Sequence, residues 1–333
     1  MHQWIRLSLT SIVLFFYFSS VGSAEAQQTR EERLNERMEY YIKYGTLTSL
    51  PWYYLAAVDQ FERNNQLVRY DIPRREGTLS IHFREEDWVG LLNPNKKDNS
   101  LESIIFWGGH GRDGNLDGLA DRKNDEDVLY TMANYLSEYG HSEEDFKQAL
   151  TKYYMREESV KQILTITAIY KHFNTLNLYD HTFPLPLQHI YSYRSTWGDS
   201  RGWGGRRMHE GTDIFASHGV PVLATTYGVV EEKGWNEYGG WRIGIRDIHN
   251  VYHYYAHLSG FHEDIKKGDI VKPGTKIGYV GSTGYGKKGT SGRFPPHLHY
   301  GMYMDNGRTV WAFDPFPSLR LWENQERERK NEE

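Results

Sequence analysis

Apolar residues recur at helical spacing through the first half of the chain, between Thr29 and about Leu178. In several segments they stand three or four positions apart, which is the period of one face of an α-helix. Proline suits the first turn of a helix, so Pro51 marks a start, and Ser142-Glu143-Glu144-Asp145 resembles a capping box. The segments with this pattern are residues 31–44, 51–61, 127–139, 142–155 and 159–173. We expect them to pack as one helical domain over residues 27–178.

The pattern changes after Tyr179, where glycine becomes frequent and the apolar runs become short. Pro184 and Pro186 break any helix there and indicate a linker over residues 179–196. Short runs of β-like composition follow, separated by glycine-containing turns: residues 220–224, 228–232, 241–246, 251–257, 276–280 and 297–304. They predict an all-β domain over residues 197–322, built as a small sandwich or a partly open barrel. The charged residues 323–333 predict a frayed, solvated tail.

The first 26 residues have the form of an export signal. Arg6 precedes an apolar stretch from Leu7 to Phe18, and Ala24-Glu25-Ala26 matches an A-x-A cleavage pattern. Residues 1–26 are therefore predicted to be a signal peptide, or an N-terminal anchor if they stay uncleaved. No other segment is apolar enough to cross a bilayer. We expect an exported, extracytoplasmic protein of a bacterial cell wall.

The composition of the chain excludes several partners and metal ligands. The 333 residues carry a formal net charge of −5, so nothing indicates a nucleic-acid partner, for which a basic stripe is expected. The chain has no cysteine, which excludes a disulfide framework. Any zinc ion must therefore be held by histidine and carboxylate.

Three short phrases in the second half carry histidines and a carboxylate. They are His209-Glu210-Gly211-Thr212-Asp213, Tyr255-Ala256-His257-Leu258 and Pro295-Pro296-His297-Leu298-His299. Alternation along a strand places His297 and His299 on one face, and it places His253, Tyr255 and His257 together in the same way. Three protein ligands of these types with one open position are typical of a catalytic zinc site.

Each of these histidines by itself would more often be structural. His209 would usually be a solvated loop residue, and His257 would usually bond a backbone carbonyl inside the core. Their joint occurrence in one glycine-rich β domain favours a catalytic metal instead. His218, His249 and His262 lack partners at useful spacing, and we expect them to be structural.

The three phrases together resemble the lysostaphin and LytM type of zinc endopeptidase. So do residues 267–284, KGDIVKPGTKIGYVGSTG, and the Gly-Val-Pro-Val run that begins at Gly219. The resemblance covers roughly residues 197–317. It implies one zinc ion per chain, with His209, Asp213 and His299 as ligands and His257 and His297 as the catalytic pair. It also implies hydrolysis of peptide bonds in bacterial cell-wall peptidoglycan.

This assignment is chemically coherent. Zinc lowers the pKa of a bound water to about 7 and polarises a scissile carbonyl. Two nearby histidines can accept the water's proton, stabilise the oxyanion or protonate the leaving amine, because the pKa of histidine is near working pH. Which of His257 and His297 acts as the base is open at this level.

The overall layout narrows the resemblance. An export signal, a helical region and a C-terminal zinc domain are similar to the L-Ala–D-Glu peptidases of endospore-forming bacteria. That likeness implies a role in sporulation, with stem peptides of the spore cortex as substrate.

The helical half carries a resemblance of its own. Residues 51–62, PWYYLAAVDQFE, resemble the helix that bears the catalytic glutamate of lysozyme-like lytic transglycosylases, which puts Glu62 at the general-acid position. The Gly-x-Met-Gln-Phe phrase usual in that group is absent, so a module that binds glycan or positions the peptidase is favoured.

Three functional hypotheses remain from the sequence. The chain is an active zinc endopeptidase, a non-catalytic wall-binding or scaffold protein, or a two-headed hydrolase that also cuts glycan through Glu62. All five positions of the metal and catalytic motif are filled, which favours the first.

Overall fold

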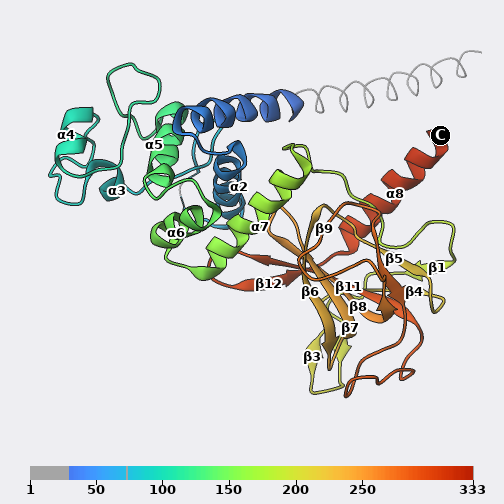
Figure 1. The fold of residues 1–333 in the computed structure, drawn as a ribbon. Helices are drawn as coiled ribbons and strands as arrows, with labels where there is room; N and C mark the ends of the chain where they lie inside the picture. Colours follow the sequence, from blue (N-terminus) through green and yellow to red (C-terminus); the bar gives the residue numbers. More distant parts are fainter. Residues whose placement is uncertain (1–29, 73, 333) are drawn as a thin grey trace, which may run out of the picture. The chain divides into compact units, whose positions relative to one another are not determined.

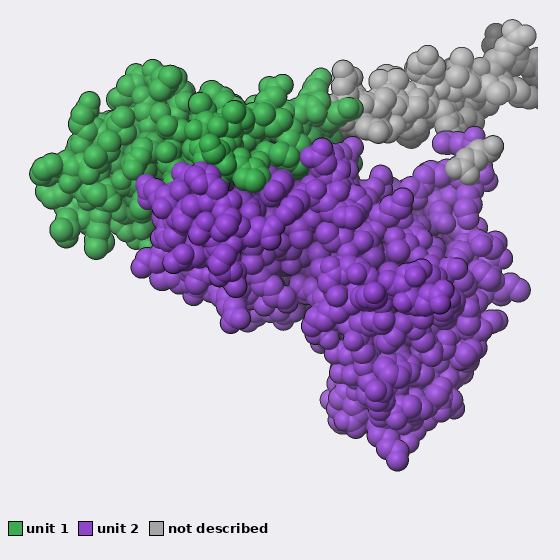
Figure 2. Space-filling model, in the orientation of Figure 1, with its two compact units in different colours: residues 1–52, 76–79, 83–134 green, residues 53–75, 80–82, 135–333 purple. Residues whose placement is uncertain are grey.

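The computed structural model describes residues 30–72 and 74–332 (Figure 1). These residues fall into two compact units, which Figure 2 colours separately. Unit 1 contains the described residues up to Trp52 together with Glu76–Leu79 and Phe83–Asn134, and unit 2 contains the rest. The predicted signal segment, residues 1–26, lies outside the described residues. Within the described ranges, no helix combines the length and apolar character that crossing a bilayer requires.

The predicted helices of the first half are confirmed. A helix covers residues 30–48, and α2 (Trp52–Val68) begins directly after Pro51. The later ones are α5 (Asp125–Ser137), α6 (Glu143–Tyr154) and α7 (Glu157–Phe173). The Ser142 side chain accepts from the Asp145 backbone N–H and the Asp145 side chain accepts from the Ser142 N–H, so the capping box at the start of α6 is also confirmed. Two short helices, α3 (Glu85–Val89) and α4 (Leu101–Phe106), carry no apolar period long enough to predict them.

The helices are divided between the two units. The helix at residues 30–48, α3, α4 and most of α5 belong to unit 1, where the buried Trp88 indole donates to the Ala120 carbonyl at 3.0 Å. Helices α2, α6 and α7 belong to unit 2, and Tyr54 of α2 stacks on Phe146 of α6 with ring centroids 3.9 Å apart. Three helices that the sequence groups into one helical domain thus share a compact unit with the sheet.

The strands of the unit 2 sheet are β1 (Tyr191–Tyr193), β4 (Thr212–Ala216), β5 (Pro221–Leu223), β6 (Gly228–Asn236), β7 (Gly240–Arg246), β8 (Val251–Phe261), β9 (Ile270–Val271), β10 (Lys276–Val280), β11 (His297–Asp305) and β12 (Val310–Phe313). The sheet is antiparallel, and its main path runs β1-β4-β11-β8-β7-β6-β9. Strand β10 pairs with β5 and β8, and β12 pairs with β11. A separate hairpin joins β2 (Ser200–Arg201) to β3 (Arg207–Met208). The six predicted strands are all present. The structure adds β1, β4, β9, β12 and the β2–β3 hairpin.

The residues predicted to form a linker are part of the sheet's core. Phe183 and Leu185 are fully buried there, the Leu223 N–H donates to the Pro184 carbonyl, and β1 pairs with β4. The linker interpretation of residues 179–196 is therefore wrong for this stretch. Proline does end the helical pattern, but the apolar residues between the prolines bury themselves against the strands.

The predicted tail is not frayed, because residues 316–332 form helix α8 (Phe316–Glu332), although most of its side chains after Glu323 are exposed. Glu323 of α8 is buried and accepts hydrogen bonds from the hydroxyls of Tyr191 and Tyr193 at 2.7 and 2.5 Å. Arg327, one turn later, donates to the same carboxylate at 2.7 Å. A charged run is typical of a solvated segment, but the two tyrosines come from the distant strand β1 and tie the helix to the sheet.

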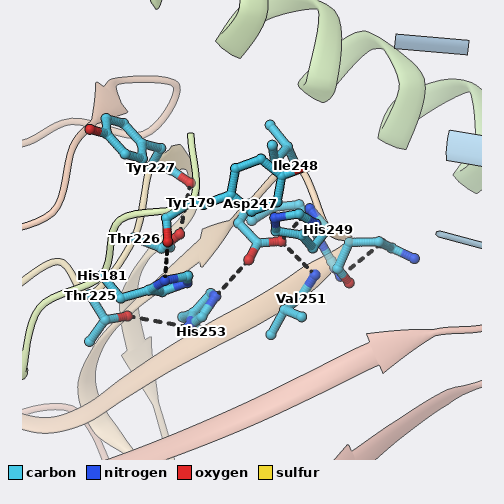
Figure 3. A network of polar contacts seen from close by, with 12 residues as sticks. Tyr179, His181, Thr225, Thr226, Tyr227, Asp247, Ile248, His249, Val251 and His253 are labelled. Carbon is cyan, nitrogen blue, oxygen red and sulfur yellow. Dashed lines mark hydrogen bonds and ion pairs between the residues drawn. The ribbon is translucent and has the colours of Figure 1, made fainter. Parts of the chain in front are cut away.

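A buried polar network lies against β8, as Figure 3 shows. His253 Nε2 lies 3.1 Å from Asp247 Oδ2, and His253 Nδ1 lies 2.6 Å from the Tyr300 hydroxyl. The other Asp247 oxygen accepts hydrogen bonds of 2.8 Å from the N–H groups of His249 and Val251. The network satisfies groups that would otherwise be buried without partners, and it commits His253 to the interior of the domain.

Candidate metal centre and catalytic cleft

Neighbouring strands of the sheet bring the predicted ligands together. In the pairing of β4 with β11, Asp213 stands directly opposite His299. Side chains at opposed positions leave the same face of a sheet, so these two groups meet. His209 lies just before β4, where its N–H donates to the Asp199 carbonyl at 2.9 Å.

The ligand atoms of these three residues converge. His209 Nε2 lies 2.9 Å from His299 Nδ1, and Asp213 Oδ1 lies 3.0 Å from both nitrogens. One donor atom from each residue falls within 4.8 Å of the other two. Two imidazole nitrogens and one carboxylate oxygen aimed at a common centre fit a zinc ion that keeps an open position.

Backbone carbonyls orient three of the four histidine rings. The contacts run from Nδ1 of His209, His257 and His297 to the carbonyl oxygens of Thr196, Thr283 and Pro295, at 2.7, 2.7 and 2.8 Å. A ring that donates its Nδ1–H keeps the lone pair on Nε2. His299 differs, because its Nδ1 is the atom that faces Asp213.

The predicted alternation along β11 is confirmed. His297 and His299 both line the cleft, and His297 Nε2 lies 3.7 Å from Asp213 Oδ1. Leu298 and Tyr300, which alternate with them, are fully buried in the core.

The predicted alternation along β8 fails at His257. His253 and Tyr255 face the core, but His257 lines the cleft, with its ring centroid 4.8 Å from that of His297. The pairing of β8 with β7 shifts register between Tyr255 and Leu258, and His257 has a left-handed φ of 63°. A β-bulge with this backbone rotates the side chain to the other face of the strand. Periodicity of two cannot reveal such a bulge.

Burial and hydrogen bonding together shift the pKa values of these groups. Burial lowers the pKa of His257 well below its ordinary value, and it also lowers the pKa of His297 and His299 despite the nearby Asp213. Burial by itself would raise the pKa of Asp213, but hydrogen bonds with His209 and His299 hold that pKa well below its usual range. Neutral imidazole and ionised carboxylate are the forms that bind metals.

Gly211 leaves room for a ligand ring. A Cβ at this position would lie 2.5 Å from His299 Cε1 and 2.7 Å from the Tyr300 carbonyl oxygen. The structural reason for a glycine at this position is therefore the close approach of the His299 ring.

The cleft has a volume of about 300 Å³ and contains all five residues predicted from sequence. Arg201 also lines it and donates to Asp213 Oδ2 at 2.7 Å. Further lining residues that no motif indicates are Arg207, Tyr238, Tyr254, Tyr285 and Tyr303. Alternation by itself puts Tyr254 on the face opposite His257, so no pattern in the sequence places any of these residues in the cleft.

This arrangement defines a class. A candidate metal site of two histidines and an aspartate, with two further imidazoles facing the same cleft, is typical of a metal-dependent hydrolase. The family model described as Peptidase family M23 matches residues 207–311.

A relative matches nearly the whole chain. The L-Ala–D-Glu endopeptidase of Bacillus subtilis (strain 168) is 53% identical over 322 residues, which cover 97% of this chain and 99% of the relative. The chain therefore belongs to peptidase family M23, and it is an enzyme, an endopeptidase.

Other relatives match the second half. Lysostaphin of Staphylococcus simulans is 39% identical over 115 residues, covering 34% of this chain and 22% of lysostaphin. The solved catalytic domain of that peptidase aligns with 33% identity and a TM-score of 0.34, covering 42% of this chain and 99% of its own.

Proposed function

We propose that the protein is a zinc-dependent endopeptidase that hydrolyses the L-Ala–D-Glu bond in the stem peptides of bacterial peptidoglycan. The supporting observation is the convergence of His209, Asp213 and His299 in a chain that matches an L-Ala–D-Glu endopeptidase over nearly its full length. The same relative supports a cell-wall location. Export through residues 1–26 and a role in sporulation are further parts of this proposal.

The proposal gives each side chain a task. His209, Asp213 and His299 hold one zinc ion, which when bound polarises the scissile carbonyl and acidifies water. His257 and His297 lie with their ring centroids 4.8 Å apart, and the Nδ1 contact of each ring to a carbonyl leaves Nε2 as a base. One imidazole accepts the proton of the attacking water, and the other stabilises the developing oxyanion or donates a proton to the leaving amine.

The test is digestion of purified peptidoglycan by the zinc-loaded protein, followed by mass analysis of the soluble products. Peptides that begin with D-Glu, with L-Ala left at the new C-terminus of the sugar-bound fragment, are the expected products. Cleavage at another peptide bond would overturn the bond assignment and keep the peptidase. A zinc-loaded protein that cuts no peptide bond would favour the wall-binding or scaffold alternative.

The lysozyme-like interpretation of the helical half is a second candidate. One observation favours it: burial raises the pKa of Glu62 to about 7, and the Tyr154 hydroxyl donates to Glu62 Oε1 at 2.7 Å. A carboxyl that stays protonated near neutral pH suits a general acid. Glycan fragments released by a His297→Ala variant, and lost on adding Glu62→Gln, would support a two-headed hydrolase. Their absence would leave Glu62 as a structural residue.

A further inference from the structure

Two arginines face each other across the hairpin beside the cleft. In the pairing of β2 with β3, Arg201 stands directly opposite Arg207, and both line the cleft that holds the metal ligands. Directly opposed residues project from the same face of a hairpin, and like charges in that arrangement repel. Two anionic partners in or beside the cleft would offset this repulsion, one for each arginine.

The protein itself supplies only one of these partners among the described residues. Arg201 forms an ion pair of 2.7 Å with Asp213. Arg207 forms no ion pair with any carboxylate in residues 30–72 and 74–332, and its Nε is buried without a hydrogen-bond partner. A buried guanidinium N–H without an acceptor is costly unless something else supplies one.

Arg207 is nevertheless held in position. Its guanidinium carbon lies 5.2 Å from the centre of the Tyr238 ring, and Trp203 at the hairpin tip packs edge-on to the same ring at 5.1 Å. An arginine that stacks through its face keeps the N–H donors at its edge for a planar anion. Arg207 is thus a positioned cation with unused donors inside the cleft.

We propose that Arg207 determines specificity by binding a carboxylate of the substrate residue that contributes the scissile nitrogen. This inference rests on the proposed function, in which that residue is a glutamyl residue. A glutamyl unit has two carboxyls, and chain extension uses one of them. The other remains as an anion two or four bonds from the scissile nitrogen, depending on which carboxyl is linked. A group so close to the reacting bond must lie within the same cleft.

The Arg207 guanidinium and a substrate carboxylate match in both charge and shape. A guanidinium and a carboxylate form two parallel N–H···O hydrogen bonds, which fix orientation as well as charge. Arg201 does not compete for the substrate carboxylate, because its guanidinium already binds Asp213. A carboxamide in place of the carboxylate would accept fewer hydrogen bonds from Arg207 and would carry no charge.

The experiment compares two L-alanyl–D-glutamyl peptides that differ only in whether the unlinked glutamyl carboxyl is free or amidated. With the zinc-loaded full chain, we expect kcat/KM to be higher for the free acid by roughly 10- to 100-fold. Arg207→Gln should bring the ratio of the two rates close to one, mainly by raising KM for the acid. Arg207→Lys should keep part of the preference, since it retains charge without the planar fork.

Arg206→Gln is the matched control, because Arg206 is the exposed neighbour and lies outside the cleft lining. It should keep the wild-type ratio, and all variants should keep the wild-type zinc content. An unchanged acid-to-amide ratio in Arg207→Gln, or a wild-type enzyme that does not discriminate, overturns the inference while the proposed function stands. If the wild-type protein cuts neither peptide, the proposed bond is wrong and the inference falls with it.

Discussion

The Arg201 guanidinium donates to Oδ2 of Asp213 at 2.7 Å, while Oδ1 of the same carboxylate faces His209 and His299. The arginine thus fixes which oxygen of Asp213 faces the two histidines. Partners that orient a ligand in this way fix its position and basicity, and with them the metal affinity.

We expect Arg201→Gln to weaken zinc binding by about 10- to 100-fold, because Asp213 loses the contact that orients it. The measurement is competition for zinc against a chelator of known affinity. Arg206→Gln, which removes an exposed charge from the same hairpin, should bind zinc like the wild type. Equal affinities for all three proteins would show that Arg201 does not position the ligand.

One experiment should distinguish the histidines predicted to bind zinc from those predicted to transfer protons. His209→Ala removes a predicted ligand and should lose both stoichiometric zinc and hydrolysis. His297→Ala should keep its zinc and lose at least about 100-fold in kcat, because it removes a proton-transfer group. Metal analysis beside a peptide cleavage assay checks this, with exposed His218→Ala as control. Loss of zinc from His297→Ala would refute the division of roles.

Gly211→Ala should impair the site although it changes no functional group. The added methyl would lie 2.5 Å from the His299 ring, so the ring must move away from the point where the ligands meet. A ligand displaced by about 1 Å is expected to cost on the order of 100-fold in kcat/KM. Gly234→Ala is a suitable comparison, because a Cβ there meets no atom within 4 Å. Wild-type kinetics in Gly211→Ala would mean that the ring has room.

Glu62 should make the protein less stable as pH rises. Its folded-state pKa of about 7 lies above that of an unfolded glutamate, chiefly because of burial. The unfolded chain therefore releases this proton first, so the Glu62 contribution to stability declines from about pH 4.5 to about pH 7 and is flat above. The total decline is on the order of 3 kcal/mol.

Glu62→Gln should remove this decline. The stability of the variant relative to wild type should therefore be greater at pH 8 than at pH 4. Urea unfolding at a series of pH values measures it, with exposed Glu328→Gln as control. A difference between wild type and Glu62→Gln that does not change with pH would place the folded-state pKa of Glu62 near its ordinary value.

The sequence alone predicts most of the secondary structure and the candidate site residues of this protein. Apolar spacing locates the long helices and the six main strands, because each element's period repeats within a few residues. Short local phrases contain the five residues His209, Asp213, His257, His297 and His299, so the sequence alone is enough to select them. Alternation also placed the two histidines of β11 on one face correctly.

Tertiary structure decided whatever depends on residues that meet from distant positions. The bulge that turns His257 toward the cleft depends on the pairing of β8 with its neighbours. Phe183 and Glu323 are buried because distant strands and tyrosines cover them, although their local sequences resemble a linker and a solvated tail. The pairing of Arg201 with Asp213, and the unpaired Arg207 opposite it, follow from hairpin register. Side-chain period is a property of the local backbone, whereas burial and charge pairing are properties of neighbours that only the folded chain assembles.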